Sequence, residues 1–499
     1  LEQLQTQRFI LWKGASTTVS CWLTNEGRAI ARDVSGELAV PEGFALRGSA
    51  TRRLASVAPG QRAALSWTVS ASDETPGAYA RAAVRVGDEP VGELGTLLVS
   101  GGRCVGQPPA AVGAGTNDVM AIVGNDRIRL AFAKASFGYG PAELFVRGTG
   151  TFAYVGAMPR LGRLVVQGDD GPADVFLTAD QVRAVENRLV FKGTGLPVGG
   201  GTWDFPWTVT VPPDSNVAEF AASAKSSDAA KVLAFEGPML YAGEGAFGEQ
   251  KGEALFPGLE WLEGMERSSN TLDIELGHPD QVRYVPHPNK VTIPLMAVET
   301  QDALVALLWD QEQKWDGEHF TAAAAFASPN FVDAQANHLM QLFLPAGLDY
   351  TQENSLEPKQ PYSLAAGQTV TLRQHLLLNA GGKVLDAVDR WFALYGGVPK
   401  PQAEPRGFGA ELALSRHGFL ETVWDEESKK SRHCVGWAPA NSPGFANLLL
   451  FDGYLSGSRE ALDRAELIAS QTLEQDGRRV RHPGHGDHRR LRQLEPVAR

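Results

Sequence analysis

Cysteine is scarce in this chain, with three residues in 499. Cys21, Cys104 and Cys434 show neither the spacing of a metal site nor that of a disulfide framework. A bridge between Cys21 and Cys104 stays open for an oxidising compartment, beside the alternative that Cys21 is a buried free thiol. Cysteine chemistry therefore gives no indication of function.

Several other signals are missing as well. No run of about eighteen apolar residues occurs, so we expect no membrane-spanning helix. Acidic residues outnumber basic ones by 58 to 46, and the net charge of -12 argues against a nucleic-acid partner. The chain contains no G-x-S-x-G nucleophile elbow, no P-loop and no dinucleotide-binding motif. The net charge remains compatible with a neutral or cationic binding partner.

Histidines and acidic turns offer no good metal site either. His482, His485 and His488 recur every three residues, but Pro483 and neighbouring glycines oppose the helix that would bring them together. The acidic turn at residues 168–171 is interpreted as an ordinary turn. The sequence therefore predicts no metal and no cofactor.

Residues 8–100 alternate apolar and polar side chains in short segments separated by turn residues. This period of two, broken about every ten residues, is typical of an antiparallel sandwich. The runs at 17–46 and 54–86, with turns at Asn25-Glu26-Gly27 and Pro76-Gly77, resemble the bacterial immunoglobulin-like modules appended to α-galactosidases and other extracellular glycosidases. The resemblance implies a spacer or docking module without chemistry.

A much longer strand-rich region follows a segment rich in glycine, proline and alanine. The alternating pattern continues from residue 119 to residue 378, without a helix-period segment of convincing length. Strands without crossover helices indicate one large two-sheet sandwich rather than an α/β fold. We therefore expect a mostly β protein.

The apolar period changes to three and four residues at Lys383, which predicts a helix over 383–395 that ends at Gly396-Gly397. Further helices are predicted over 409–424, 444–455 and 459–474, the last with Ser458 as its N-cap. The expected regions are an Ig-like β-sandwich (1–100), a linker (101–118), a β super-sandwich (119–380), a linker helix (381–402), a short all-α region (403–475) and a disordered basic tail (476–499).

A large β-sandwich, a connecting helix and then paired helices resemble the architecture of the six-hairpin glycosidases. In that family a galactose-mutarotase-like super-sandwich precedes an (α/α)6 toroid, and the segments FPGLEWLEGMERSS and PHPNKVTIPLMAV look like parts of such a sandwich. The resemblance implies a sugar cleft and glycoside hydrolysis. Too few residues follow Lys400 for twelve helices, so we expect an incomplete toroid that lacks part of the catalytic apparatus.

The stretch ALFPGLEWLEGMERSS, at residues 254–269, gathers three acids, an arginine and a tryptophan. Glycoside hydrolysis needs one carboxylic acid to protonate the leaving oxygen and one carboxylate to activate water or attack carbon. We predict catalytic roles for Glu260 and Glu263, and substrate-binding roles for Trp261, Glu266 and Arg267. The alternative is a solvated acidic loop with Arg267 as an ordinary ion-pair partner.

A second group of candidates lies on the predicted helix over 409–424. His417, Glu421 and Trp424 fall at i, i+4 and i+7 and would share a face, with Asp425 directly beyond. Glu421 and Asp425 are predicted to be catalytic, and His417 and Trp424 to bind substrate. The alternative is an ordinary solvent-exposed helix face.

Trp309 and Trp315 flank a polar turn after a predicted strand. Aromatic rings at the rim of a sandwich can stack on sugars, so both are predicted to bind substrate. The alternative is that they fill the edge of the core.

Three functions remain open. The first is a glycoside hydrolase-like protein that acts on an oligosaccharide or polysaccharide by acid/base catalysis, and the second is a non-catalytic carbohydrate-binding or cell-surface protein. The third is a polysaccharide lyase, which would use tyrosine, histidine and arginine beside a uronate. The surplus of acids in the sandwich loops favours the hydrolase over the lyase. Carbohydrate is the expected partner, and the resemblance implies an extracellular or periplasmic location.

Overall fold

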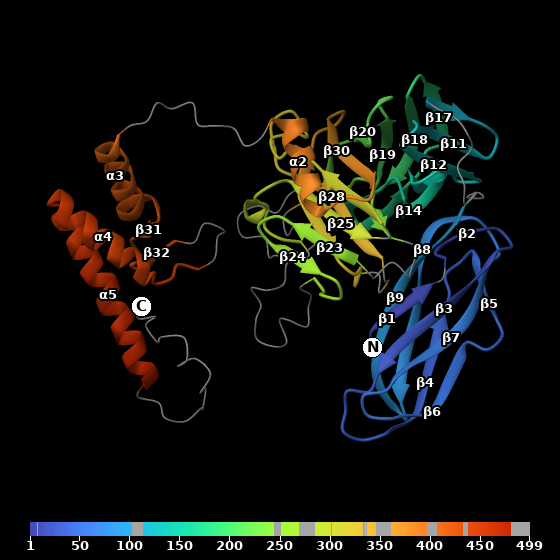
Figure 1. The fold of residues 1–499 in the computed structure, drawn as a ribbon, viewed down its shortest axis with the longest axis horizontal. Coiled ribbons are helices and arrows are strands. Elements are labelled where there is room, and N and C mark those ends of the chain that lie inside the picture. Colours follow the sequence, from blue (N-terminus) through green and yellow to red (C-terminus); the bar gives the residue numbers. More distant parts are fainter. Residues whose placement is uncertain are drawn as a thin grey trace. The chain divides into compact units, whose positions relative to one another are not determined.

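The chain is 55% strand and 15% helix, which confirms the prediction of a mostly β fold. The computed structural model describes residues 1–6, 8–101, 113–243, 251–268, 285–300, 302–332, 335, 337–345, 361–396, 407–432 and 438–480, with side chains described as far as residue 474. These residues form two compact units, Leu1–Gly397 and Val398–Arg499 (Figure 1).

The first module of unit 1 is a sandwich of two sheets, as its alternating pattern predicts. One sheet has the order β1-β3-β7-β5 and the other the order β2-β9-β8-β4-β6. The strands are β1 (Gln3–Thr6), β2 (Ile10–Trp12), β3 (Ser16–Thr24), β4 (Ala31–Ala39), β5 (Phe44–Arg47), β6 (Thr51–Val57), β7 (Arg62–Ala71), β8 (Thr75–Val86) and β9 (Glu89–Gly101). Inward-facing residues such as Val19, Leu65 and Trp67 form its core.

Cys21 also lies in this core and is fully buried. Its thiol forms no disulfide within the described residues, and Cys104 and Cys434 lie outside them. Burial raises the pKa of Cys21 to about 11. The described part of the chain therefore fits the alternative of a buried free thiol.

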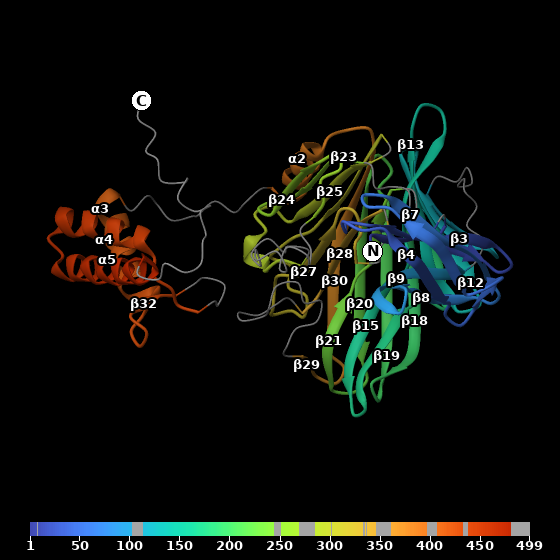
Figure 2. The same ribbon diagram turned by 90° about the horizontal axis from the view of Figure 1, so that it is seen from below.

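The second module of unit 1 packs a twelve-stranded sheet against a nine-stranded sheet (Figure 2). The larger sheet contains β10 (Gly113–Thr116), β11 (Met120–Gly124), β12 (Ile128–Ala135), β13 (Gly138–Arg147), β14 (Phe152–Met158), β15 (Gly162–Gly168), β16 (Gly171–Leu177), β21 (Ala230–Glu236), β22 (Leu240–Ala242), β27 (Ala323–Ala327), β28 (His338–Leu344) and β29 (Tyr362–Leu364). Five neighbouring strands of this sheet run in the order β16-β15-β21-β28-β27.

The smaller sheet has the order β17-β18-β19-β20-β30-β26-β25-β23-β24. Its strands are β17 (Gln181–Val185), β18 (Arg188–Val198), β19 (Gly201–Thr210), β20 (Val217–Ser226), β23 (Lys251–Phe256), β24 (Glu260–Glu263), β25 (Leu295–Thr300), β26 (Ala303–Leu308) and β30 (Thr369–Ala380). The inner faces of both sheets share one core that contains Phe132, Phe191 and Trp207. The predicted two-sheet sandwich is therefore confirmed.

Helix α2 (Val384–Tyr395) follows β30 and confirms the helix predicted over 383–395. Its apolar stripe of Val384, Ala387 and Trp391 packs on the outer face of the nine-stranded sheet (Figure 2). The helix ends at Gly396, whose left-handed φ of 75° suits a residue without a Cβ.

Unit 2 contains helices α3 (Phe408–His417), α4 (Pro443–Ser456) and α5 (Arg459–Val480). A π-helical turn at Gly418–Thr422 and a small hairpin of β31 (Trp424–Asp425) and β32 (Lys430–Ser431) lie between α3 and α4. Ser458 Oγ accepts from Ala461 N at 3.3 Å, which confirms Ser458 as an N-cap. Helix α5 continues past the expected start of the basic tail, and residues 481–499 of that tail lie outside the described residues.

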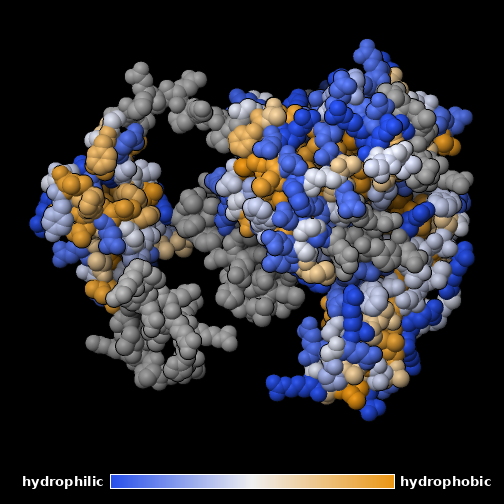
Figure 3. Space-filling view, in the orientation of Figure 1, coloured by the Kyte–Doolittle hydropathy of each residue, from blue (hydrophilic) through white to orange (hydrophobic). Residues whose placement is uncertain are grey.

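Helix α4 of unit 2 is apolar around most of its circumference. Leu449 is buried against α5, whereas Leu448, Phe451 and Tyr454 are 53%, 65% and 77% exposed. Figure 3 shows the apolar residues of this unit gathered over its helices. No helix within the described residues is both long and apolar enough to cross a membrane.

Candidate functional site

The predicted acidic stretch forms an edge hairpin of the nine-stranded sheet. Glu260 to Glu263 make strand β24, which pairs with β23, so this part is a strand rather than the loop considered from the sequence. Because side chains alternate along a strand, Glu260 and Glu263 point to opposite faces. Trp261 is 53% exposed, and Glu263 N donates to Glu266 Oε2 at 2.7 Å.

Arg267 lies near the first module. Its charge contributes to the low pKa of Glu2: burial alone would raise that pKa, but hydrogen bonds from Thr24 and Arg62 and the charges of Arg62 and Arg267 hold it below its ordinary value. Glu260, Trp261 and Glu263 thus lie on strand β24 of the hairpin, and Glu266 and Arg267 follow it in the chain. Their predicted roles stay predictions.

The second group of candidates does not share one helix face. The helical region ends at Thr422, and Trp424 lies in strand β31. His417 Nδ1 is 3.0 Å from Glu421 Oε1, and both side chains are exposed. Trp424 is instead buried, and the centroid of its ring lies 3.9 Å from the guanidinium carbon of Arg464.

Asp425 belongs to the same small hairpin as Trp424. Hydrogen bonds from the side chain of Ser428 and from its backbone N, which lies 2.8 Å from Asp425 Oδ2, lower the pKa of Asp425 below its ordinary value. A carboxyl group with a lowered pKa stays ionised at neutral pH, which is unsuitable for a general acid.

Trp309 and Trp315 fill the core, as the alternative interpretation proposes. Trp309 is fully buried and Trp315 is 4% exposed. Trp315 packs against Tyr362 with ring centroids 4.9 Å apart. Neither ring offers an exposed face for stacking on a sugar.

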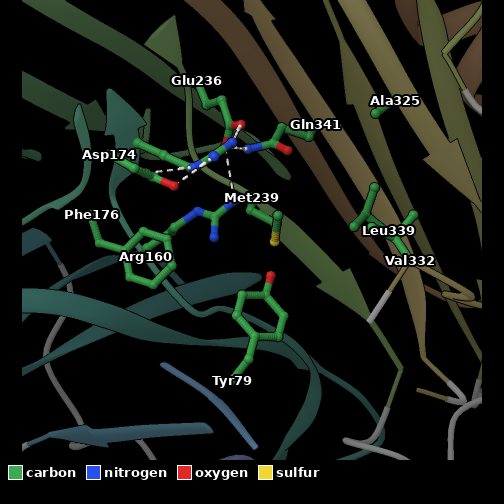
Figure 4. Close-up of a pocket in the computed structure, with 11 residues that line it drawn as sticks. Tyr79, Arg160, Asp174, Phe176, Glu236, Met239, Ala325, Val332, Leu339 and Gln341 are labelled. Carbon is green, nitrogen blue, oxygen red and sulfur yellow. Dashed lines mark hydrogen bonds and ion pairs between the residues drawn. The ribbon is translucent and has the colours of Figure 1, made fainter. Parts of the chain in front are cut away.

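A pocket of about 190 Å³ lies on the outer face of the twelve-stranded sheet and is named here the outer-face pocket (Figure 4). Five charged or amide residues and six aromatic or aliphatic residues line it: Arg160, Arg163, Asp174, Glu236 and Gln341 on the polar side, and Tyr79, Phe176, Met239, Ala325, Val332 and Leu339 on the other. Adjacent strands bring these residues together, because Arg163 pairs with both Glu236 and Phe176 in the sheet register.

The carboxylate of Glu236 is the centre of the polar side. Its Oε2 accepts from Arg160 Nη2 and from Gln341 Nε2, each at 2.8 Å, and its Oε1 accepts from Arg163 Nη1 at 2.8 Å. Glu236 and Gln341 are each 2% exposed, and Arg160 is 5% exposed. A buried carboxylate is stable only with such partners.

Arg163 connects this carboxylate to the edge of the pocket. It donates from Nε and Nη2 to the two Asp174 oxygens at 2.8 and 2.7 Å. Burial alone would lower the pKa of Arg163, but Asp174 and Glu236 raise it above its ordinary value through hydrogen bonds and charge. The guanidinium is therefore permanently charged and rigidly oriented.

Aromatic side chains border the polar cluster. The guanidinium carbon of Arg160 lies 4.6 Å from the centroid of the Phe176 ring. Tyr79, from β8 of the first module, lies across the pocket from the polar cluster in Figure 4. An apolar wall beside a few fixed polar groups is typical of a small-molecule site. Within the described residues, no group of three or more histidine, cysteine or acidic residues is placed to hold a metal ion.

Sequence reasoning missed this pocket. The one local signal is Glu236, an acid at the end of the apolar strand AKVLAFE. Its partners Arg163 and Gln341 are 73 and 105 residues away in the chain, and only the sheet order brings them together.

Comparison with known families supports the interpretation of the first module. Residues 11–87 match the family described as the NPCBM-associated, NEW3 domain of alpha-galactosidase. This match confirms the resemblance to an α-galactosidase-associated module. No curated protein matches the chain.

Several solved structures show weak similarity. The galactose mutarotase related enzyme from Lactobacillus acidophilus is 9% identical, over 53% of this chain and 99% of its own, with a TM-score of 0.31. A galactose mutarotase-like protein from Lactobacillus casei ATCC 334 is 10% identical, over 52% and 100%, with a TM-score of 0.28. The Bifidobacterium bifidum alpha-N-acetylgalactosaminidase NagBb, as a quadruple mutant, is 10% identical, over 69% and 50%, with a TM-score of 0.29. TM-scores this low establish neither fold nor function, and the six-hairpin toroid stays a prediction.

Proposed function

We propose that the protein is a carbohydrate-binding protein whose outer-face pocket holds one neutral, hydroxyl-rich sugar residue. The observation that carries this proposal is the buried cluster in which Arg160, Arg163 and Gln341 converge on Glu236 beside aromatic rings. Fixed donors and acceptors suit sugar hydroxyl groups, and the faces of aromatic rings suit the apolar side of a sugar. An extracellular or periplasmic location belongs to the same proposal.

The charge and size of the pocket limit the class of ligand that it can bind. Two arginines face two carboxylates, so the polar side is balanced and favours a neutral molecule over an ion. The volume of about 190 Å³ is below the roughly 300 Å³ at which ordinary ligand pockets begin. A single sugar residue, or the end of a longer glycan, fits these limits better than an internal chain segment.

Binding is better supported than hydrolysis at this pocket. A general acid in a glycosidase needs a raised pKa so that it stays protonated. The oxygens of Glu236 already accept from Arg160, Arg163 and Gln341, and both Asp174 oxygens accept from Arg163, so neither carboxyl group is placed to deliver a proton to a leaving oxygen. Hydrolysis remains the second candidate function because the family matched by residues 11–87 is described by its association with alpha-galactosidase.

A polysaccharide lyase is the third candidate, since the pocket contains the tyrosine and arginines that such an enzyme would use. Its uronate substrate would, however, bring a carboxylate close to Glu236 and Asp174. Both arginines already pair with these carboxylates, so a uronate would add a negative charge to a polar cluster that is already balanced, which disfavours this ligand.

Isothermal titration calorimetry of the full chain tests the proposal with methyl α-galactoside, methyl α-glucoside and galacturonate. We expect a neutral glycoside to bind and galacturonate not to bind. Asp174→Asn should weaken binding about tenfold or more, because it removes charged acceptors at the pocket, whereas Glu263→Gln should leave binding unchanged. Release of nitrophenol from nitrophenyl α-galactoside, measured in parallel, reports any hydrolysis of a glycosidic bond by the chain.

Two results would overturn the proposal. The first is no binding of any of the three sugars, and the second is binding lost in Glu263→Gln but kept in Asp174→Asn, which would place the site at the edge hairpin. Turnover that is abolished by Glu263→Gln would favour the hydrolase instead.

A further inference from the structure

The first module is packed against the outer face of the twelve-stranded sheet through a shared buried cluster. Phe9, Leu97 and Val99 of the module are at most 3% exposed in this cluster. They pack with Met239, Tyr241 and Leu339 of the second module, all at most 4% exposed. Contacts between flexibly linked domains are usually more polar and more exposed than this. The two modules therefore share a core beside the outer-face pocket.

A buried hydrogen-bond chain also joins the modules. Gln335 Nε2 donates to Thr96 Oγ1 at 2.9 Å, and Asn337 Nδ2 donates to Gln335 Oε1 at 2.7 Å. Thr96 and Gln335 are at most 1% exposed. Asn337 directly precedes β28, the strand that carries Gln341 to the Glu236 carboxylate. The position of the module is thus tied to a strand that builds the polar side of the pocket.

Gly77 brings the first module against Phe176. Its φ of +145° disfavours other residues, and a Cβ placed there would lie 2.9 Å from Phe176 Cε2. The register of β8 shifts between Thr75 and Ala78, so the strand is irregular at this point of close approach. Phe176 in turn lies against the Arg160 guanidinium. The backbone of the first module thereby limits the position of a ring that borders the polar cluster.

We infer that the NEW3-type module forms one wall of the ligand site, with Tyr79 as a specificity-determining residue and Gly77 as a positioning residue. This inference rests on the proposed function, because it assigns the Tyr79 hydroxyl to a hydroxyl group of the bound sugar. In Figure 4 that hydroxyl points toward the other lining residues. The module is then part of the binding site rather than a spacer.

Tyr79→Phe tests the role of the hydroxyl, with Tyr154→Phe as a matched control. Both rings pack against the same buried cluster, but only Tyr79 lines the pocket. In calorimetry with methyl α-galactoside and methyl α-glucoside, Tyr79→Phe should weaken binding about two- to tenfold, the range expected for one hydrogen bond. Tyr154→Phe should not change binding. Equal binding by wild type and Tyr79→Phe would overturn the inference and leave the proposed function standing.

Gly77→Ala tests the shared wall without a ligand, with Gly60→Ala as its control. Gly60 also has a positive φ, of 71°, but a Cβ there would meet nothing within 4 Å. By hydrogen-deuterium exchange, Gly77→Ala should speed exchange in residues 171–177, whereas Gly60→Ala should not. Unchanged exchange in Gly77→Ala would overturn the positioning role. A further outcome is faster exchange in Gly77→Ala together with no sugar binding by the wild type. This result would reject the proposed function and the sugar-contacting role of Tyr79, and only the packing of the first module against Phe176 would stand.

Discussion

Arg163 and Glu236 are direct cross-strand partners on β15 and β21, and Arg163 Nη1 donates to Glu236 Oε1 at 2.8 Å. On the same carboxylate, Oε2 accepts from Arg160 at 2.8 Å. An arginine pair around one buried acid fixes the polar side of the outer-face pocket before any ligand arrives. Such preorganisation lowers the entropic cost of binding.

Removal of the central carboxylate should destabilise the fold. Glu236→Gln leaves the guanidinium of Arg160, which is 5% exposed, without this carboxylate partner. Loss of one partner from a buried ion pair costs about 3–5 kcal/mol. Urea unfolding of wild type and variant measures the difference in the free energy of unfolding.

Asp174→Asn is the control for that measurement. The Asp174 side chain is 48% exposed, and a partly exposed ion pair contributes about 0–1 kcal/mol. Equal destabilisation by the two substitutions would contradict the assignment of Glu236 as the buried centre of the cluster.

Glu299 should stabilise the docking of helix α2. Its Oε1 accepts from Val384 N at 2.8 Å, and Val384 is fully buried. Glu299→Ala leaves this buried N–H without its acceptor, at a cost of about 1–3 kcal/mol. Asp386→Ala is the comparison, because Asp386 Oδ2 accepts from the N–H of the exposed Lys383, which water can replace. A larger loss in Asp386→Ala than in Glu299→Ala, measured by urea unfolding, would argue against this role.

The phenol of Tyr362 should lose its proton at a higher pH than an ordinary tyrosine. Burial, and then its hydrogen bond to Asp316 Oδ2 at 2.7 Å, raise its pKa from 10.0 to about 12. Since the pKa is raised in the folded state, the associated stability is complete below pH 10 and is lost as the pH rises through about 12. The difference in phenolate absorbance between wild type and Tyr362→Phe should show this midpoint, and Asp316→Asn should lower it. A midpoint at the ordinary value of 10.0 would refute the expectation.

The Cys21 thiol should be unreactive in the folded protein. It is fully buried, and its pKa of about 11 leaves little thiolate at pH 8. With Cys104 and Cys434 replaced by serine, a thiol reagent should modify Cys21 only as fast as the protein unfolds. Complete reaction within minutes in the absence of denaturant would show that the core around Cys21 opens easily.

Much of the fold could be predicted from local periodicity. The helix expected over 383–395 is α2, and the strand-rich region expected over 119–378 forms the strands of the two large sheets, because side-chain alternation and turn residues act within a few positions of the chain. Trp424 shows the limit of this reasoning. A helical period fits it, but the structure places it in a strand with its ring in the core of unit 2.

The candidate site could be predicted far less well. Glu260 and Glu263 drew attention because acids and a tryptophan are adjacent in the sequence, yet strand pairing places the two acids on opposite faces. The polar cluster depends on Arg163, Glu236 and Gln341, which are adjacent only through the order of β15, β21 and β28. Long-range strand order is not encoded in any local pattern of residue types.

Hydrogen-deuterium exchange of the full chain, with and without saturating methyl α-galactoside, tests the sugar-binding proposal most directly. We predict slower exchange on sugar addition in residues 162–168, 171–177 and 230–236, which carry Arg163, Asp174 and Glu236. Residues 251–263 of the edge hairpin should not change. Protection confined to residues 251–263, or no protection anywhere in the chain, would contradict the assignment of the outer-face pocket as the sugar site.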